Sequence, residues 1–176
     1  MNPIRIYKPS QSCIDLVKKH EGEKLKAYLC PAGKWTIGVG LTTYSTGVRV
    51  KEGDVITKEK SEYELRFALE RVGRNISKLL GNTIILNQNQ ADALISFVFN
   101  IGETNFSSST LLKYIKQNPG EWKIKDEFNK WIYGGNGQHN GVDDDGDGLI
   151  DEPGEKKKLN GLVARRKDEA DLYFKI

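Results

Sequence analysis

The chain has 176 residues, of which 38% are hydrophobic and 29% charged, and its 27 basic and 24 acidic side chains give a net charge of +3. This length suffices for one globular unit with its own core. The sequence contains no run of about 18 apolar residues, so no membrane-spanning helix is predicted. Seven acidic residues lie in 143–155, so the rest of the chain holds 17 acidic against 27 basic residues and carries +10. A basic body suits a polyanionic partner, but the Lys and Arg are scattered without a nucleic-acid-binding signature, and we expect no nucleic-acid partner.

The N-terminal segment is expected to form an extended arm over residues 1–10. It lacks the apolar core of a secretory signal, so we expect synthesis in the cytoplasm, with export left to another protein. Ser12 and Asp15 resemble a capping box, which predicts that the first helix opens there.

An acidic residue continues the apolar stripe of this first helix. Ile14, Val17 and Glu21 fall at positions i, i+3 and i+7, which share one helix face. A carboxyl group on a buried face is costly when ionised, so desolvation favours the neutral form that a general acid needs. Taken alone, however, a Glu at a helix end is more often a surface residue.

The chain has two cysteines, too few for a disulfide framework. Cys13 precedes Glu21 by eight residues, or about 12 Å along a helix, whereas Cys30 is expected close to Glu21. A disulfide needs Cα atoms within about 7 Å, so we expect no pairing and interpret Cys13 as a small buried hydrophobic residue.

A small antiparallel sheet is predicted from Tyr28 to Ile56, where short alternating apolar runs are separated by glycines. Gly38 and Gly40 leave one face of the sheet without side chains, so that a ligand or a second backbone can approach closely.

Helices are predicted over most of the remaining chain. Thr57 can cap a long helix that Gly81 ends, and Asn87 with Gln90 opens an apolar helix through Ile101. Further helices are expected at 108–117, at 123–133 and from about Leu162 to Phe174.

Three side chains at a fixed spacing suggest chemistry. Glu21 is followed by eight residues, then Cys30, then five residues, then Thr36. An acid at a helix end thus faces two small nucleophilic or water-holding side chains across a turn, an arrangement that suits acid-assisted hydrolysis.

Three blocks of sequence carry a resemblance to a known family. They read EGEKLKAYLCPAGKWTIGVG (21–40), NQADALISFVFNIG (89–102) and GLVARR (161–166). In these blocks and in their order, over roughly residues 12 to 174, the chain resembles the phage-type lysozymes and endolysins (glycoside hydrolase family 24, the group of the T4-phage lysozyme).

The resemblance implies a fold and its division. The fold class is α+β and lysozyme-like, a mostly helical body with a small antiparallel β-sheet lobe and a cleft between the lobes. One domain is expected, with residues 11–56 as the small lobe, 57–80 as the connecting helix and 81–176 as the helical lobe, which includes an acidic insert at about 136–158.

The resemblance also implies an activity: hydrolysis of the β-1,4 bond between N-acetylmuramic acid and N-acetylglucosamine of peptidoglycan, without a cofactor for catalysis. Glu21 is then the general acid, and Cys30 and Thr36 hold or activate the attacking water. Relatives with Asp in place of Cys30 flank the bond with two carboxylates, and a thiolate there can act as base, water-orienting group or nucleophile. Arg165 or Arg166 is the candidate for the cation that orients the acid.

A cysteine protease is the less favoured interpretation of Cys30, because it needs a histidine partner. His20 and His139 are the only histidines, and we expect both to be exposed to solvent.

The acidic insert predicts a structural calcium site. Aspartates alternate before Gly148 in the manner of an EF-hand loop, although Gly154 stands where a bidentate Glu is expected. The expected ligands are Asp143, Asp145, Asp147, Asp151 and the carbonyl of Leu149. The alternative is a solvated acidic turn.

We expect bacterial peptidoglycan as the partner of a monomer that has no stable membrane insertion. The protein is expected in the host bacterial cytoplasm and, after holin-type release or export, at the cell wall. A non-catalytic peptidoglycan-binding protein, a delivered antibacterial effector and a lytic transglycosylase remain alternatives.

Overall fold

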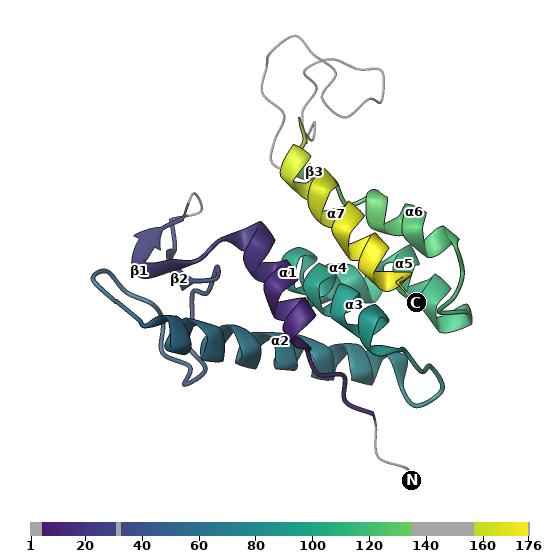
Figure 1. Cartoon of the computed structure of the whole chain (residues 1–176), viewed down its shortest axis with the longest axis horizontal. Helices are drawn as coiled ribbons and strands as arrows, with labels where there is room; N and C mark the ends of the chain where they lie inside the picture. Colours follow the sequence, from purple (N-terminus) through teal and green to yellow (C-terminus); the bar gives the residue numbers. More distant parts are fainter. Residues whose placement is uncertain (1–4, 31–32, 135–156, 176) are drawn as a thin grey trace.

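The computed structural model describes residues 5–30, 33–134 and 157–175, and it confirms the predicted α+β class. A mostly helical body carries a small sheet at one end of its longest helix (Figure 1). The elements are α1 (Gln11–Glu21), β1 (Lys24–Leu29), β2 (Trp35–Gly38), α2 (Lys58–Leu80), α3 (Gln88–Ile101), α4 (Glu103–Ser108), α5 (Thr110–Gln117), α6 (Lys123–Asn129), β3 (Tyr133–Gly134), β4 (Lys157–Lys158) and α7 (Asn160–Tyr173).

The sheet at the end of α2 is antiparallel, as predicted, and pairs Tyr28 with Thr36 and Leu29 with Trp35. Single bridges extend it as far as Val55, which pairs with Lys26. The first strand begins at Lys24, four residues before the predicted start. Its lysines point to solvent and alternate with half-buried neighbours, as in a strand that is buried on one face only.

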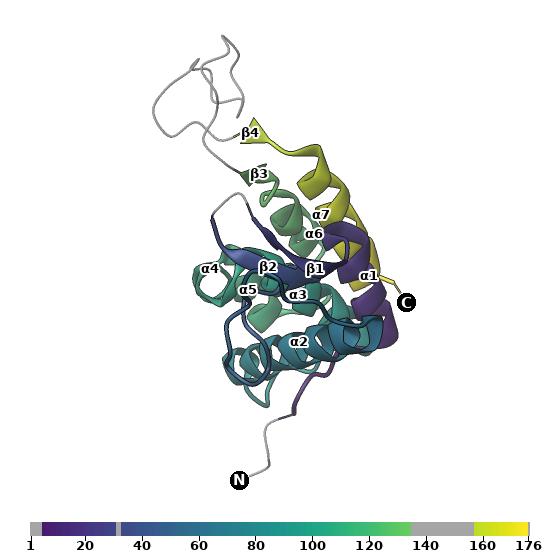
Figure 2. The same ribbon diagram turned by 90° about the vertical axis from the view of Figure 1, so that its left-hand side faces the viewer.

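The caps predicted for the two central helices are confirmed. Thr57 Oγ1 accepts from the Lys60 N–H at the start of α2, and the Gly81 N–H donates to Ser77 at its end. A reciprocal capping box between Asn87 and Gln90 opens α3. Helix α3 packs against α1, α2 and α7 (Figure 2). Most of its residues from Ala91 to Val98 belong to the hydrophobic core.

The start predicted for α1 is wrong. The N-cap is Ser10, whose hydroxyl accepts from the Ser12 N–H, while Asp15 is engaged by the Gln11 side chain. Ser10 also donates from its backbone and its hydroxyl to the buried carboxylate of Asp92 on α3. This tertiary contact fixes the helix start. A local sequence motif cannot predict it, because Asp92 lies far from Ser10 in the sequence.

Two further helices each differ from the prediction at one boundary, the first at its start and the second at its end. The segment predicted as helix 108–117 is divided at Ser109, whose extended backbone separates α4 from α5 and whose hydroxyl caps α5. The segment predicted as helix 123–133 ends at Asn129, since Tyr133–Gly134 instead pairs with Lys157–Lys158.

The interpretation of Cys13 is confirmed. It is fully buried in the core, its thiol contacts the Asp92 carbonyl, and burial raises the pKa of that thiol well above its usual range. No disulfide joins it to Cys30. Within the described part of the chain, no helix is both long and apolar enough to span a membrane.

Candidate active site

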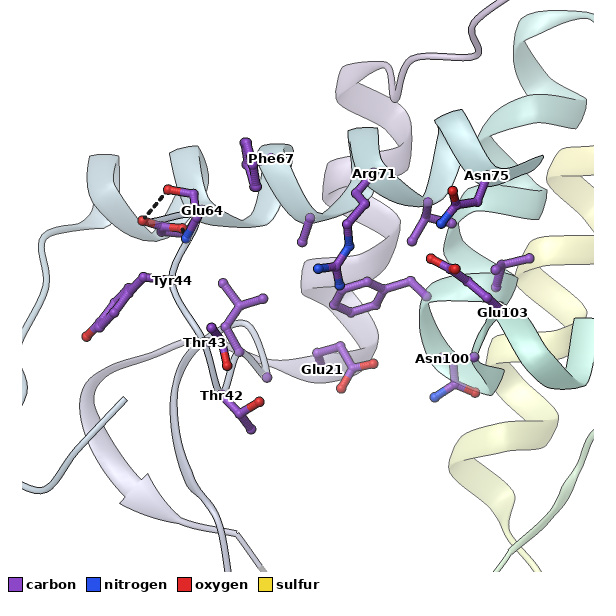
Figure 3. A pocket seen from close by; sticks show the side chains of 18 residues that line it. Glu21, Thr42, Thr43, Tyr44, Glu64, Phe67, Arg71, Asn75, Asn100 and Glu103 are labelled. Carbon is purple, nitrogen blue, oxygen red and sulfur yellow. Dashed lines mark hydrogen bonds between the residues drawn. The ribbon is translucent and has the colours of Figure 1, made fainter. Parts of the chain in front are cut away.

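A cleft of about 920 Å³ lies beside α2, between the sheet end and the helical body (Figure 3). Its described walls come from the end of α1, the segment after β2, one face of α2, and the end of α3 with the start of α4. Of the three side chains predicted for catalysis, Glu21 is the one that lines this cleft. The cleft therefore gives a carboxyl group access to a ligand large enough to contact both parts of the molecule.

Glu21 is the last residue of α1, and its two oxygens have different environments. Gly22 ends the helix with a positive φ of 71° and a hydrogen bond from its N–H to Lys18. Arg165 Nη1 donates to Glu21 Oε1 at 2.6 Å, and the Glu21 side chain keeps 26% of its surface exposed. A Cβ built on Gly40 would lie 3.6 Å from Oε2. One oxygen is thus anchored to α7, while the other faces Gly40 in the wall of the cleft.

Arg165 is buried and shared between two carboxylates. Its Nε donates to Glu169 Oε1 at 3.0 Å, and its Nη2 donates to the Ser96 carbonyl at 3.2 Å. Ser96 Oγ donates to the same Glu169 oxygen at 2.7 Å. Burial raises the pKa of Glu169, against the opposing attraction of the arginines. Every nitrogen of the Arg165 guanidinium has a partner, so it holds Glu21 from a fixed position.

Arg166, the other arginine proposed to orient the acid, is directed elsewhere. It is fully buried, with Nε 3.1 Å from Glu169 Oε2 and its guanidinium 4.7 Å from the centre of the Phe97 ring. Its Nη2 donates to Asn100 Oδ1 at 2.7 Å. Burial lowers the pKa of Arg166 to about 10, so it stays charged near neutral pH.

Cys30 and Thr36 lie together in the β1–β2 hairpin. The Lys34 carbonyl accepts from the Cys30 N–H at 2.9 Å and from Thr36 Oγ1 at 3.0 Å. Thr36 is opposite Tyr28 in the register, and Cys30 follows Tyr28 by two residues, which puts all three on one side of the hairpin. Neither Cys30 nor Thr36 is among the described residues that line the cleft around Glu21. The structure thus fixes these two residues relative to each other through the same carbonyl group.

The expectation that His20 is exposed is wrong, because α7 packs against the end of α1. The His20 side chain is 10% exposed, and its Nε2 donates to Asp168 Oδ2 at 2.8 Å. Burial lowers the pKa of His20, more than its hydrogen bond to Asp168 raises it. Burial would raise the pKa of Asp168, but hydrogen bonds from Lys19 and His20 outweigh it and lower that pKa. His139 lies outside the described residues.

Several polar residues of the cleft were not predicted from the sequence. Arg71 and Asn75 come from α2, and Asn100 and Glu103 from the end of α3 and the start of α4 (Figure 3). The helical spacing of Arg71 and Asn75, four residues apart, was a usable signal for a shared face. Which face of α2 meets the cleft follows only from tertiary packing.

Glu64, also on α2, fixes the wall of the cleft that follows the sheet. Its buried carboxylate accepts from the Ser45 N–H at 2.6 Å and the Ser45 hydroxyl at 3.1 Å, and Lys60 Nζ lies 2.7 Å away. Burial alone would raise the pKa of Glu64, but the contacts with Lys60 and Ser45 lower it. Glu64 therefore acts as a structural anion in this wall.

The predicted calcium ligands, Asp143, Asp145, Asp147, Leu149 and Asp151, lie outside the described residues. Within residues 5–30, 33–134 and 157–175, no three His, Cys, Asp or Glu side chains are grouped so that they could hold a metal ion.

Known proteins are similar to this chain over nearly its whole length. The family model described as phage lysozyme matches residues 18–169. The endolysin of Acyrthosiphon pisum secondary endosymbiont phage 1 is 38% identical over 165 residues, which is 93% of this chain and 96% of that protein. The solved endolysin from Escherichia coli O157:H7 phage FAHEc1 is 30% identical, with a TM-score of 0.77 over 95% of this chain and 93% of that one. The muramidase domain of SpmX from Asticaccaulis excentricus is 27% identical, with a TM-score of 0.77 over 97% of this chain and 99% of that domain.

Proposed function

Since this chain belongs to the phage lysozyme family, we propose that it is a muramidase that hydrolyses the β-1,4 bond between N-acetylmuramic acid and N-acetylglucosamine, with Glu21 as the general acid. The family membership makes it a glycoside hydrolase-type enzyme that acts on the bacterial cell wall. The muramidase domain among its structural neighbours supports the choice of bond.

One observation carries the assignment of the acid: Glu21 lines the cleft with one oxygen held by Arg165 and the other toward Gly40. In the proposed reaction, the free oxygen of protonated Glu21 gives its proton to the glycosidic oxygen as the bond to the anomeric carbon breaks. A water molecule then adds its oxygen to the anomeric carbon, and the proton that it loses passes to a basic group of the site or to bulk water. Because Arg165 already fixes the carboxyl group, the proton-donating oxygen does not have to lose conformational freedom during the reaction.

Cys30 and Thr36 are proposed to hold or activate that water. Their shared contact with the Lys34 carbonyl fixes them relative to each other on one side of the hairpin. At this position the thiol can act as base, water-orienting group or nucleophile.

The test is the digestion of purified peptidoglycan by wild type, Glu21→Gln and Cys30→Ser, with fragments identified by mass spectrometry. Reducing muramic acid ends from wild type, lost almost entirely in Glu21→Gln, support a muramidase with this acid. Anhydro-muramic ends would identify a lytic transglycosylase instead. Binding of wild type to the wall without cleavage would identify a peptidoglycan-binding protein.

We also propose a monomer that is made in the host cytoplasm and reaches the wall after holin-type release or export. Size-exclusion chromatography with light scattering tests the monomer, and a dimeric mass would overturn it. Lysis timing in cells with and without a co-expressed holin tests the route.

A structural calcium ion is proposed for the acidic segment 143–151, from the alternating aspartates of its sequence alone. It would supply no catalytic chemistry. Isothermal titration of the chelator-treated protein with calcium measures it directly, and no binding at millimolar calcium would overturn the proposal.

A further inference from the structure

Asn100 stands where the end of α3 meets the cleft, and its amide has a fixed direction. Arg166 Nη2 contacts one end of this amide at 2.7 Å. A guanidinium has donors only, so the amide atom that faces Arg166 must be the oxygen, and the NH₂ group must face away from it. Figure 3 shows the Asn100 nitrogen on the side of Glu21 and the oxygen on the side of α7. Two N–H donors are therefore directed into the same cleft as the proposed general acid.

Arg166 is well suited to fix that direction. It is fully buried, its Nε lies beside the Glu169 carboxylate, and its guanidinium lies over the Phe97 ring. Such a guanidinium cannot turn away without leaving a buried charge unpaired, which is costly. Asn100 itself is exposed, so its amide could otherwise rotate freely between its two orientations. The proposed hydrolysis makes no use of Arg166, because Arg165 is the arginine that hydrogen-bonds Glu21 in the described part of the chain.

We infer that Asn100 is a substrate-binding residue whose side-chain N–H groups donate to an amide carbonyl of the glycan, and that Arg166 is the positioning residue that presents them. This inference rests on the proposed function. Peptidoglycan offers amide carbonyls in the acetamido groups of its sugars and in the peptide attached to the muramic acid. Both sources present the same acceptor, and the substrates below distinguish them.

The test compares the wild type with Asn100→Asp. The variant keeps an oxygen toward Arg166 and turns the contact into an ion pair, so the melting temperature should not fall. It replaces the donors by an acceptor, so a substrate carbonyl would face a carboxylate oxygen. Asn75→Asp is the matched control, because Asn75 lines the same cleft and no described side chain fixes its amide.

Each protein is assayed on intact glycan strands, N-deacetylated strands and peptide-free strands. We expect Asn100→Asp to lose about tenfold or more in kcat/KM on intact strands, mostly through KM, because an unmatched acceptor then faces the carbonyl. Its preference for acetylated over deacetylated strands should collapse, while Asn75→Asp keeps the wild-type preference. If peptide removal, and not deacetylation, abolishes the difference between wild type and Asn100→Asp, the acceptor is the peptide amide. Wild-type rates and preferences on all three substrates in Asn100→Asp would overturn the inference.

Arg166→Lys tests the positioning role. It keeps the charge but shortens the reach to Asn100, so KM should rise in the same acetyl-dependent way while kcat is largely retained. Its melting temperature is measured in parallel, and should this variant fail to fold, Asn100→Asp decides the question.

A binding experiment separates this inference from the proposed function. Isotope-labelled wild type is titrated with N,N′-diacetylchitobiose and with its deacetylated form while the Asn100 side-chain NH₂ signals are followed. Shifts with the acetylated disaccharide alone support the inference even if the wild type cleaves no peptidoglycan. Unmoved signals with both disaccharides, in a protein that does cleave peptidoglycan, would refute the acetamido contact and leave the proposed function intact.

Discussion

Gly40 offers a substitution that separates catalysis from stability. Its backbone has a φ of +76°, and a Cβ added there would lie 3.6 Å from Glu21 Oε2. Gly53 has a similar φ of +82°, but a Cβ added there would meet no atom within 4 Å. Gly40→Ala and Gly53→Ala therefore both place an L-residue at a similar positive φ, while only the first adds a methyl group beside the proposed proton donor.

The expected magnitudes follow from these two geometries. An L-residue in the left-handed region costs roughly 1–2 kcal/mol, which in a chain of this size lowers Tm by roughly 2–8 °C. The 3.6 Å contact at Gly40 is of ordinary van der Waals length, so it adds little to this loss of stability. The methyl group nevertheless occupies the side from which the glycosidic oxygen must come within about 3 Å of Glu21. A displacement of about 1 Å costs on the order of 10²-fold in rate, and we expect that loss of kcat/KM in Gly40→Ala alone.

Both variants would be compared with wild type by thermal unfolding and by release of reducing ends from purified peptidoglycan at a temperature well below either Tm. We expect similar Tm values for the two variants and wild-type activity for Gly53→Ala. Equal activity in the two variants would show that the free Glu21 oxygen does not receive substrate from the Gly40 side. A much lower Tm in Gly40→Ala than in Gly53→Ala would show that the added methyl group disturbs packing.

Cys30→Ala should lower kcat by about 10²-fold, and Cys30→Asp should retain most of the wild-type kcat. Both are measured as released reducing ends. Full activity in the alanine variant would exclude a role for the thiol. Arg165→Met should lower the free energy of unfolding by about 3–5 kcal/mol in urea titrations, and Arg165→Lys by less, because the methionine removes the buried cation that Glu21 and the buried Glu169 share. Because burial lowers the pKa of His20 below its ordinary value, the unfolded chain binds more protons at this histidine than the folded chain does. The free energy of unfolding should therefore fall as the pH drops below about 6.5. His20→Gln should lose less Tm over that pH range than wild type. Calcium should raise the Tm of chelator-treated protein, and Asp-to-Asn replacement of all four aspartates among the predicted ligands in 143–151 should abolish the increase.

Local signals in the sequence were sufficient for the central helices. Thr57 and Asn87 satisfy the first N–H groups of their helices through side chains of the same segment, so their roles follow from sequence spacing. Ser10 shows where this approach fails. Its position as N-cap depends on Asp92, which is 82 residues away in the sequence, and the local motif at Ser12 was misleading.

The candidate site divides in the same way. Glu21 was predicted because a helix stripe and a family motif both pass through it, and the structure places it at the cleft. The choice between Arg165 and Arg166 was left open, because neighbouring residues on a helix point about 100° apart and the orientation of α7 is a tertiary property. The burial of His20 and the direction of the Asn100 amide were not predicted, since both depend on partners from α7.

One turn of α7 therefore organises most of the described site. Arg165 holds Glu21, Arg166 holds Asn100, and Asp168 holds the histidine next to Glu21. This helix follows directly on the acidic connection 135–156, yet the pairing of Gly134 with Lys157 brings the two ends of that connection together. Helix α7 packs on α3 and α6, and these contacts hold it in place. An insert can be accommodated at this place in the chain because Arg165, which hydrogen-bonds Glu21, lies on α7 after the β3–β4 pair.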